Sequence, residues 1–126
     1  RGWATTGDVT SLFNQGITTS FAAIGIPGQA ASYIASAPDA QLTGTPAEQL
    51  RLIITQKYYA MCGFQGFEAW TEWRRTGYPN FLVISAASII GGGRMPLRFL
   101  YPNSEVNTNL NFPGSVPVFE PVWWDK

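Results

Sequence analysis

Residues 45–79, TPAEQLRLIITQKYYAMCGFQGFEAWTEWRRTGYP, decide the fold of this chain. The stretch opens with a strong helix start. Thr45 takes the N-cap position, Pro46 the first helical position, and Glu48 the reciprocal position of a capping box. The sequence therefore predicts a helix over Pro46–Cys62.

A second helix follows almost at once, and we predict it over Gly66–Thr76. Gly63 ends the first helix, while Gly77 and Pro79 end the second, because glycine best tolerates the left-handed position after a helix. About three residues join the two helices, so they form a hairpin or a sharp corner.

Helices are also expected upstream of this pair. Apolar residues at helical spacing predict one over about Asp8–Ile24, capped by Thr6 or Asp8, and a shorter one follows at Gln29–Ser36. The chain is therefore expected to be mainly α-helical.

The pattern changes after Pro79, where the apolar stretch lacks helical spacing. Phe81–Ser85 and Met95–Leu100 suit short strands, with a GGG turn between them, or buried extended chain. A short helical turn is expected from Asn103 or Ser104, and the rest reads as long irregular loops.

The composition excludes several classes of function. Eight basic and eight acidic residues give zero net charge, which argues against a nucleic-acid partner. The chain has no histidine, and its single cysteine, Cys62, rules out an internal disulfide and a cysteine zinc site, so we expect no metal and no cofactor. Charged residues make up only 13%, so we expect the domain to bury surface against something else.

A lysine falls in the middle of the apolar face of the first predicted helix. At 100° per residue, Lys57 is surrounded by Leu50, Ile53, Ile54, Ala60 and Met61. The opposite face holds Glu48, Arg51, Thr55 and Tyr59. Lys57 must reach out to water or meet a carboxylate, since an unpaired buried cation is very costly. The sequence leaves its acidic partner open.

The second helix carries two arginines on different faces. Arg74 lies on the apolar face with Phe67, Ala69, Trp70 and Trp73, whereas Arg75 lies with Glu68, Thr71 and Glu72. Arg75 is expected to pair with Glu72 at three-residue spacing. Arg74 needs a partner from elsewhere, and we choose Glu105, for which Arg98 competes.

Glu68 and Glu72 resemble the carboxylate pair of a glycosidase. A solvated face beside an arginine explains them better, so we assign no catalytic residue and keep a glycoside hydrolase as a remote alternative. Aromatic residues are better candidates for binding, because their faces stack on sugar rings. Trp3 and Tyr33 lie outside the strong helical patterns and are our ligand-contact candidates.

The segment IITQKYYAMCGFQGFEAWTEWRRTGYPNF (53–81) resembles the SusD/RagB-like outer-membrane nutrient-binding lipoproteins of Bacteroidetes, specifically SusD-like family 2. RGWATTGDVTSLFNQGITTSF (1–21), MPLRFLYPNSEVNTN (95–109) and VWWDK (122–126) resemble the same family in the same order. The resemblance implies a structural role, not a ligand contact, for a set of residues that match the family pattern: Lys57, Trp70, Arg74, Arg75, Thr76, Gly77, Tyr78, Pro79, Arg98, Tyr101, Pro102 and Glu105. The resemblance identifies no ligand-contact residue in this chain.

This resemblance implies a SusD-like fold with tetratricopeptide-type helix pairs. Residues 1–126 would form the C-terminal segment, with the N-terminal helical repeats and the lipid-anchoring cysteine absent. Family members lie on the outer face of the outer membrane, capture glycans or peptides without catalysis, and pass them to a SusC-like TonB-dependent transporter. The alternative is a structural segment that braces the helical repeats and contacts the transporter, with the ligand bound elsewhere.

Overall fold

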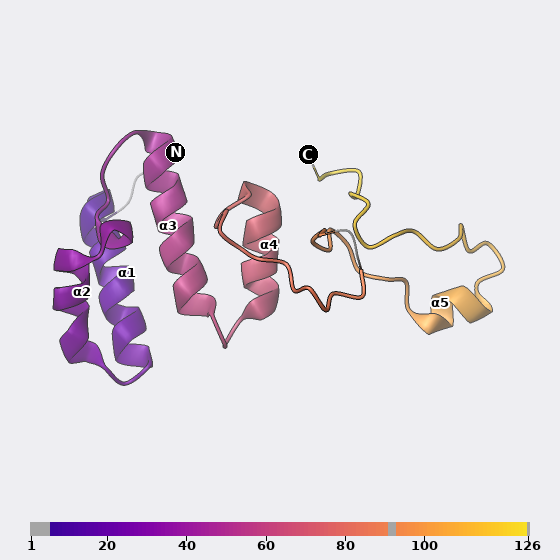
Figure 1. Cartoon of the computed structure of the whole chain (residues 1–126), viewed down its shortest axis with the longest axis horizontal. Coiled ribbons are helices and arrows are strands. Elements are labelled where there is room, and N and C mark those ends of the chain that lie inside the picture. Colours follow the sequence, from indigo (N-terminus) through magenta and orange to yellow (C-terminus); the bar gives the residue numbers. More distant parts are fainter. Residues whose placement is uncertain (1–5, 91–92, 126) are drawn as a thin grey trace. The chain divides into compact units, whose positions relative to one another are not determined.

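The computed structural model describes residues 6–90 and 93–125, and these form a mainly helical protein (Figure 1). The chain divides into two compact units, Arg1–Asn80 and Phe81–Lys126. The first unit contains α1 (Val9–Ala23), α2 (Ala30–Ser36), α3 (Pro46–Met61) and α4 (Gly66–Thr76), with 3₁₀ turns at Pro27–Gln29 and Pro38–Ala40. The second unit contains α5 (Asn103–Thr108).

The helix boundaries follow the predicted capping residues. The Asp8 side chain accepts hydrogen bonds from the amides of Thr10 and Ser11 at the start of α1. Thr45 and Glu48 form the complete capping box at the start of α3. Gly77 ends α4 with φ of +73°, the left-handed conformation that a side chain disfavours. The predicted helices are confirmed to within a residue or two.

The core of the first unit lies where α1 meets the chain leading into α3. Its buried residues are Phe13, Ile17 and Ala40, and the half-buried hydrophobic residues packed against them are Phe21, Tyr33, Ile34, Ala37, Leu42 and Ile53. Figure 1 shows α1 and α2 side by side, with α3 beside them and α4 after it. Helix α3 contacts α1, the 3₁₀ turn at Pro38–Ala40 and α4.

The burial of α3 corrects the single-face prediction. Leu52 and Thr55 are buried although the helical wheel gave them no place on the apolar face, while Leu50 and Ala60 are exposed. The reason is that α3 packs on two sides. Its Gln56 bonds to Tyr33 of α2, and its Lys57 bonds to Glu72 of α4.

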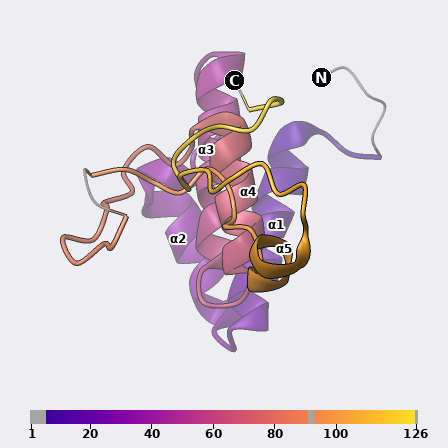
Figure 2. The same ribbon diagram turned by 90° about the vertical axis from the view of Figure 1, so that its right-hand side faces the viewer.

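The second unit is irregular chain apart from α5 (Figures 1 and 2). Phe81–Ser85 and Met95–Leu100 match neither alternative in full: no described residue forms a strand, and the irregular chain found there is not buried, with Val83 92% and Leu100 69% exposed. The backbone amides of Leu97 and Arg98 donate to the Val118 carbonyl instead of to a hairpin partner. Residues 91–92 of the expected turn lie outside the described residues.

No helix within residues 6–90 and 93–125 combines the length and the apolar character that crossing a membrane requires.

Two leucines on α3 test its two-sided packing. Leu52 is 4% exposed and Leu50 is 39% exposed. We expect Leu52→Ala to lower the free energy of unfolding by about 2–5 kcal/mol, because it removes a buried side chain and leaves a cavity. Leu50→Ala is the matched control and should cost about 1 kcal/mol or less. Urea denaturation measures both, and equal losses would contradict the burial pattern of α3.

Candidate functional site

One carboxylate joins α3 to α4. Oε1 of Glu72 accepts a hydrogen bond from Nζ of Lys57 at 3.0 Å, and Oε2 accepts one from Nη2 of Arg75 at 2.6 Å. The Glu72 side chain is 17% exposed, whereas both cations are nearly half exposed. Lys57 therefore reaches the edge of the helix pair and meets an acid there, and the sequence had not identified that acid.

The chemistry of Glu72 is that of a paired carboxylate. Burial alone raises its pKa, but hydrogen bonds from Arg75 and Lys57 lower the pKa by more, so the net shift is downward. A glycosidase acid needs the reverse, a carboxyl whose pKa is raised. Glu68, the other member of the suspected pair, is exposed. The two residues form a charged surface on α4.

Arg74 takes a different position from Arg75. It is half-buried, and its guanidinium carbon lies 4.7 Å from the centre of the Trp70 ring, one turn earlier on α4. This is a cation–π geometry. The expected partner, Glu105, belongs to the second unit, so a pair between Arg74 and Glu105 stays a prediction.

Within the second unit, the structure does not bring Arg98 and Glu105 together as an ion pair. Nη2 of Arg98 donates to the Tyr101 hydroxyl at 3.4 Å, and the guanidinium lies over the Tyr101 ring. Nε of Arg98 is buried and has no hydrogen-bond partner among the described residues. Glu105 accepts from the side-chain amide of Asn109.

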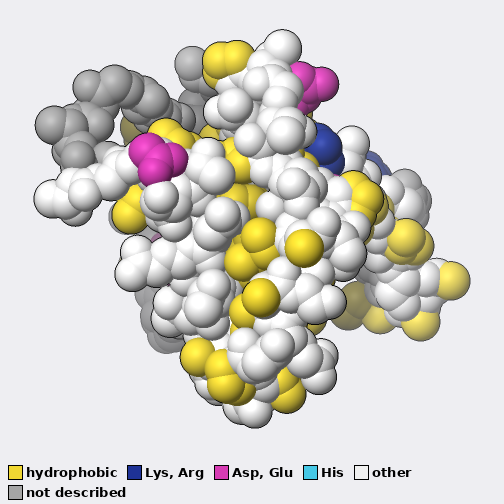
Figure 3. Space-filling view, turned by 90° about the vertical axis from the view of Figure 1, so that its left-hand side faces the viewer, with side chains coloured by type: hydrophobic (Ala, Val, Ile, Leu, Met, Phe, Trp, Pro, Cys, Tyr) yellow, Lys and Arg dark blue, Asp and Glu magenta, His cyan; other side chains and the backbone are white. Residues whose placement is uncertain are grey.

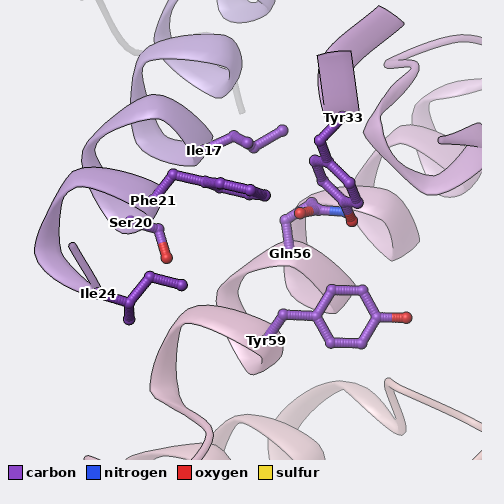
Figure 4. Close-up of a pocket in the computed structure, with 7 residues that line it drawn as sticks. All are labelled: Ile17, Ser20, Phe21, Ile24, Tyr33, Gln56 and Tyr59. Carbon is purple, nitrogen blue, oxygen red and sulfur yellow. The ribbon is translucent and has the colours of Figure 1, made fainter. Parts of the chain in front are cut away.

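Of the two candidate ligand contacts, Tyr33 lines a hollow in the first unit, and Trp3 lies outside the described residues. The hollow opens between α1, α2 and α3 and has a volume of about 220 Å³ (Figure 4). Its lining residues are Ile17, Ser20, Phe21, Ile24, Tyr33, Gln56 and Tyr59. The hollow thus combines three aromatic rings with a few polar groups, as small-molecule sites commonly do.

Hydrogen bonds orient the polar groups of this hollow. Nε2 of Gln56 donates to the Tyr33 hydroxyl at 2.9 Å and to the Asp39 carbonyl at 3.1 Å. The Tyr59 hydroxyl donates to the Asp39 carboxylate at 3.4 Å. Burial, and then the nearby Asp39 charge, raise the pKa of Tyr59, so this ring stays neutral around pH 7.

A second, shallower hollow of about 460 Å³ shares Ser20 and Ile24 with the first. It extends along α1 to Phe64, which is exposed beyond the end of α3. Viewed from the α1 and α2 side, the molecule carries scattered hydrophobic patches and few charged side chains (Figure 3). The first unit therefore presents a largely neutral surface here.

The sequence alone did not indicate Phe21, Gln56 or Tyr59 as partners of Tyr33. Phe21 and Tyr33 lie on different helices with ring centres 5.2 Å apart. The sequence placed Tyr59 on the polar face of its helix. That position indicated that the Tyr59 ring reaches the surface, but it did not indicate which residues surround the ring. Nothing in the spacing predicted that α3 turns this face toward α2.

Comparison with known proteins identifies the family. A family model described as "Starch-binding associating with outer membrane", SusD-like family 2, matches residues 1–102. The chain belongs to this family, whose members are generally non-catalytic glycan-binding proteins associated with the outer membrane. No curated protein and no solved structure matches the chain.

The Glu72 ion cluster predicts a dependence of stability on pH. Because the folded-state pKa of Glu72 lies below its ordinary value of 4.5, its contribution is present above pH 4.5 and is lost as pH falls through the folded pKa. Glu72→Gln should lower the free energy of unfolding at pH 7 by about 1 kcal/mol, since the partners are half exposed. The difference from the unchanged protein should shrink below pH 4.5.

Glu68→Gln is the matched control on the same helix, because Glu68 is exposed. Thermal melts at several pH values should show a small effect that does not follow the Glu72 profile. A constant deficit of Glu72→Gln down to the most acidic pH would contradict the role of the charge.

Proposed function

We propose that this chain is the C-terminal segment of a nutrient-capture protein on the outer face of the outer membrane, held there by a lipid on an N-terminal cysteine outside this chain. The protein binds glycan, or in the alternative peptide, and delivers it to a SusC-like TonB-dependent transporter. The observation that carries this proposal is the family match over residues 1–102.

The electrostatics of α4 support binding over catalysis. Lys57 and Arg75 hold Glu72 in its charged form, so it is a poor proton donor near neutral pH. Glu68 is exposed and lines neither of the two apolar hollows. A hydrolase would need one carboxyl kept protonated in an apolar pocket. The remote alternative of a glycoside hydrolase therefore has no support in this helix.

A carrier must also release what it captures, so affinity should be modest. Aromatic contact with a few hydrogen bonds suits that need, because only the surplus over ordering and desolvation costs appears as affinity. The hollow around Tyr33 offers that combination.

A second proposed role is structural: the second unit would brace other parts of the protein by packing against them. The apolar surface that this unit exposes supports the role. No described residue of the second unit is buried. Its large hydrophobic residues with the most exposure are Val83, Ile89, Phe99, Leu100, Leu110 and Trp123. Exposed apolar surface on this scale marks a region that packs against another surface. We propose that this unit braces the helical repeats and contacts the transporter.

Binding without cleavage is the expected outcome for a starch fragment. The full chain should bind maltohexaose with a dissociation constant of roughly 10 μM to 1 mM, equivalent to about 4–7 kcal/mol. Isothermal titration calorimetry measures the binding, and chromatography of the sugar after long incubation measures cleavage. We expect Glu72→Gln and Glu68→Gln to leave both results unchanged.

Release of shorter sugars by the unchanged chain, abolished in Glu72→Gln, would overturn the proposal in favour of a hydrolase. Delivery is tested separately by co-purification of the tagged full protein with outer-membrane proteins in mild detergent. Recovery without any TonB-dependent transporter would count against that part.

A further inference from the structure

We propose that the hollow between α1, α2 and α3 is a contact site for one neutral sugar ring, with Tyr59 and Phe21 as its apolar walls and the Gln56–Tyr33 pair as its polar edge. This assignment rests on the proposed glycan-binding function and adds to it the site. The family description names starch and the resemblance names glycans, but neither says which residues contact the sugar.

The size of the hollow limits what it can hold. Its volume of about 220 Å³ is below the range of roughly 300–1,000 Å³ typical of drug-sized ligands, so it suits a single ring of a longer chain. Figure 4 shows the Phe21 and Tyr59 side chains on opposite sides of the opening, from α1 and α3. Tyr59 is 40% exposed, so its ring is accessible to a ligand.

The polar edge has one acceptor and one donor to offer. Gln56 uses its amide nitrogen for the Tyr33 hydroxyl and the Asp39 carbonyl, and because a carbonyl only accepts, this fixes the amide orientation. Oε1 of Gln56 then accepts no hydrogen bond from the described residues. The Tyr33 hydroxyl accepts from Gln56 and retains its own proton. Sugar hydroxyls donate and accept, so they match both groups.

Charge favours a neutral ligand. The seven lining residues include no aspartate, glutamate, lysine or arginine. The Tyr59 hydroxyl bonds to the carboxylate of Asp39, which also pairs with Arg51 at 3.8 Å, and neither Asp39 nor Arg51 lines the hollow. With no cation in the lining, the hollow has nothing to pair with an anionic sugar or a phosphate.

Two adjacent tyrosines provide a matched test on α3. Tyr59→Ala removes an apolar wall of the hollow, and Tyr58→Ala removes the same side chain from a position that does not line it. By calorimetry with maltohexaose, we expect Tyr59→Ala to weaken binding about ten-fold and Tyr58→Ala to leave it within about two-fold. Tyr59→Phe keeps the ring and should retain binding.

A second variant tests the cavity without removing a wall. Ser20 is half-buried at the edge of the hollow, so Ser20→Phe should fill the space and weaken binding to a similar extent. Circular dichroism melts of every variant verify folding.

The outcomes separate the two proposals. Binding of maltohexaose that Tyr59→Ala and Ser20→Phe leave unchanged would overturn the hollow and leave the glycan-binding function standing. No binding of either maltohexaose or a neutral apolar peptide by the unchanged chain would overturn both. Tighter binding of a neutral apolar peptide than of the sugar, lost in Tyr59→Ala, would overturn the assignment to a sugar.

Discussion

The first unit depends on α3 being buried from two sides. Its Gln56 and Tyr59 face α2 and the turn containing Asp39, and its Lys57 faces α4. Because the chain has few charged residues, α3 is positioned mainly by apolar contacts. A small number of hydrogen bonds and ion pairs at the edges of these apolar contacts add to them. Together those bonds link α3 to α2, to the turn containing Asp39 and to α4, which fixes how the helix is rotated about its own axis.

That rotation separates two kinds of surface. On the α4 side, Lys57 and Arg75 form ion pairs with Glu72, and this charged cluster joins α3 to α4. On the α2 side, Gln56 and Tyr33 are neutral and keep hydrogen-bonding capacity beside aromatic rings. Binding of a neutral ligand, as proposed, fits the second surface, whereas the first surface holds its carboxylate in ion pairs.

The second unit has a different physical character. It contains one short helix, and hydrogen bonds such as those from Leu97 and Arg98 to Val118 hold its extended chain in place of a sheet. Because its described residues include none that is buried, it lacks a core of its own. A segment of this kind gains stability by packing against another surface, and this is the physical basis of the proposed bracing role.

The sequence by itself determined the helices of this protein, because capping is local: Thr45 and Glu48 act within one turn, and Gly77 ends α4 through its own backbone. The sequence motif around α4 also identified the family, and the family match over residues 1–102 confirmed that identification. Only the tertiary structure decided that Leu52 is buried and that Gln56 meets Tyr33. A helical wheel shows which residues share a face, but the number of faces that are covered depends on how many neighbours the helix packs against.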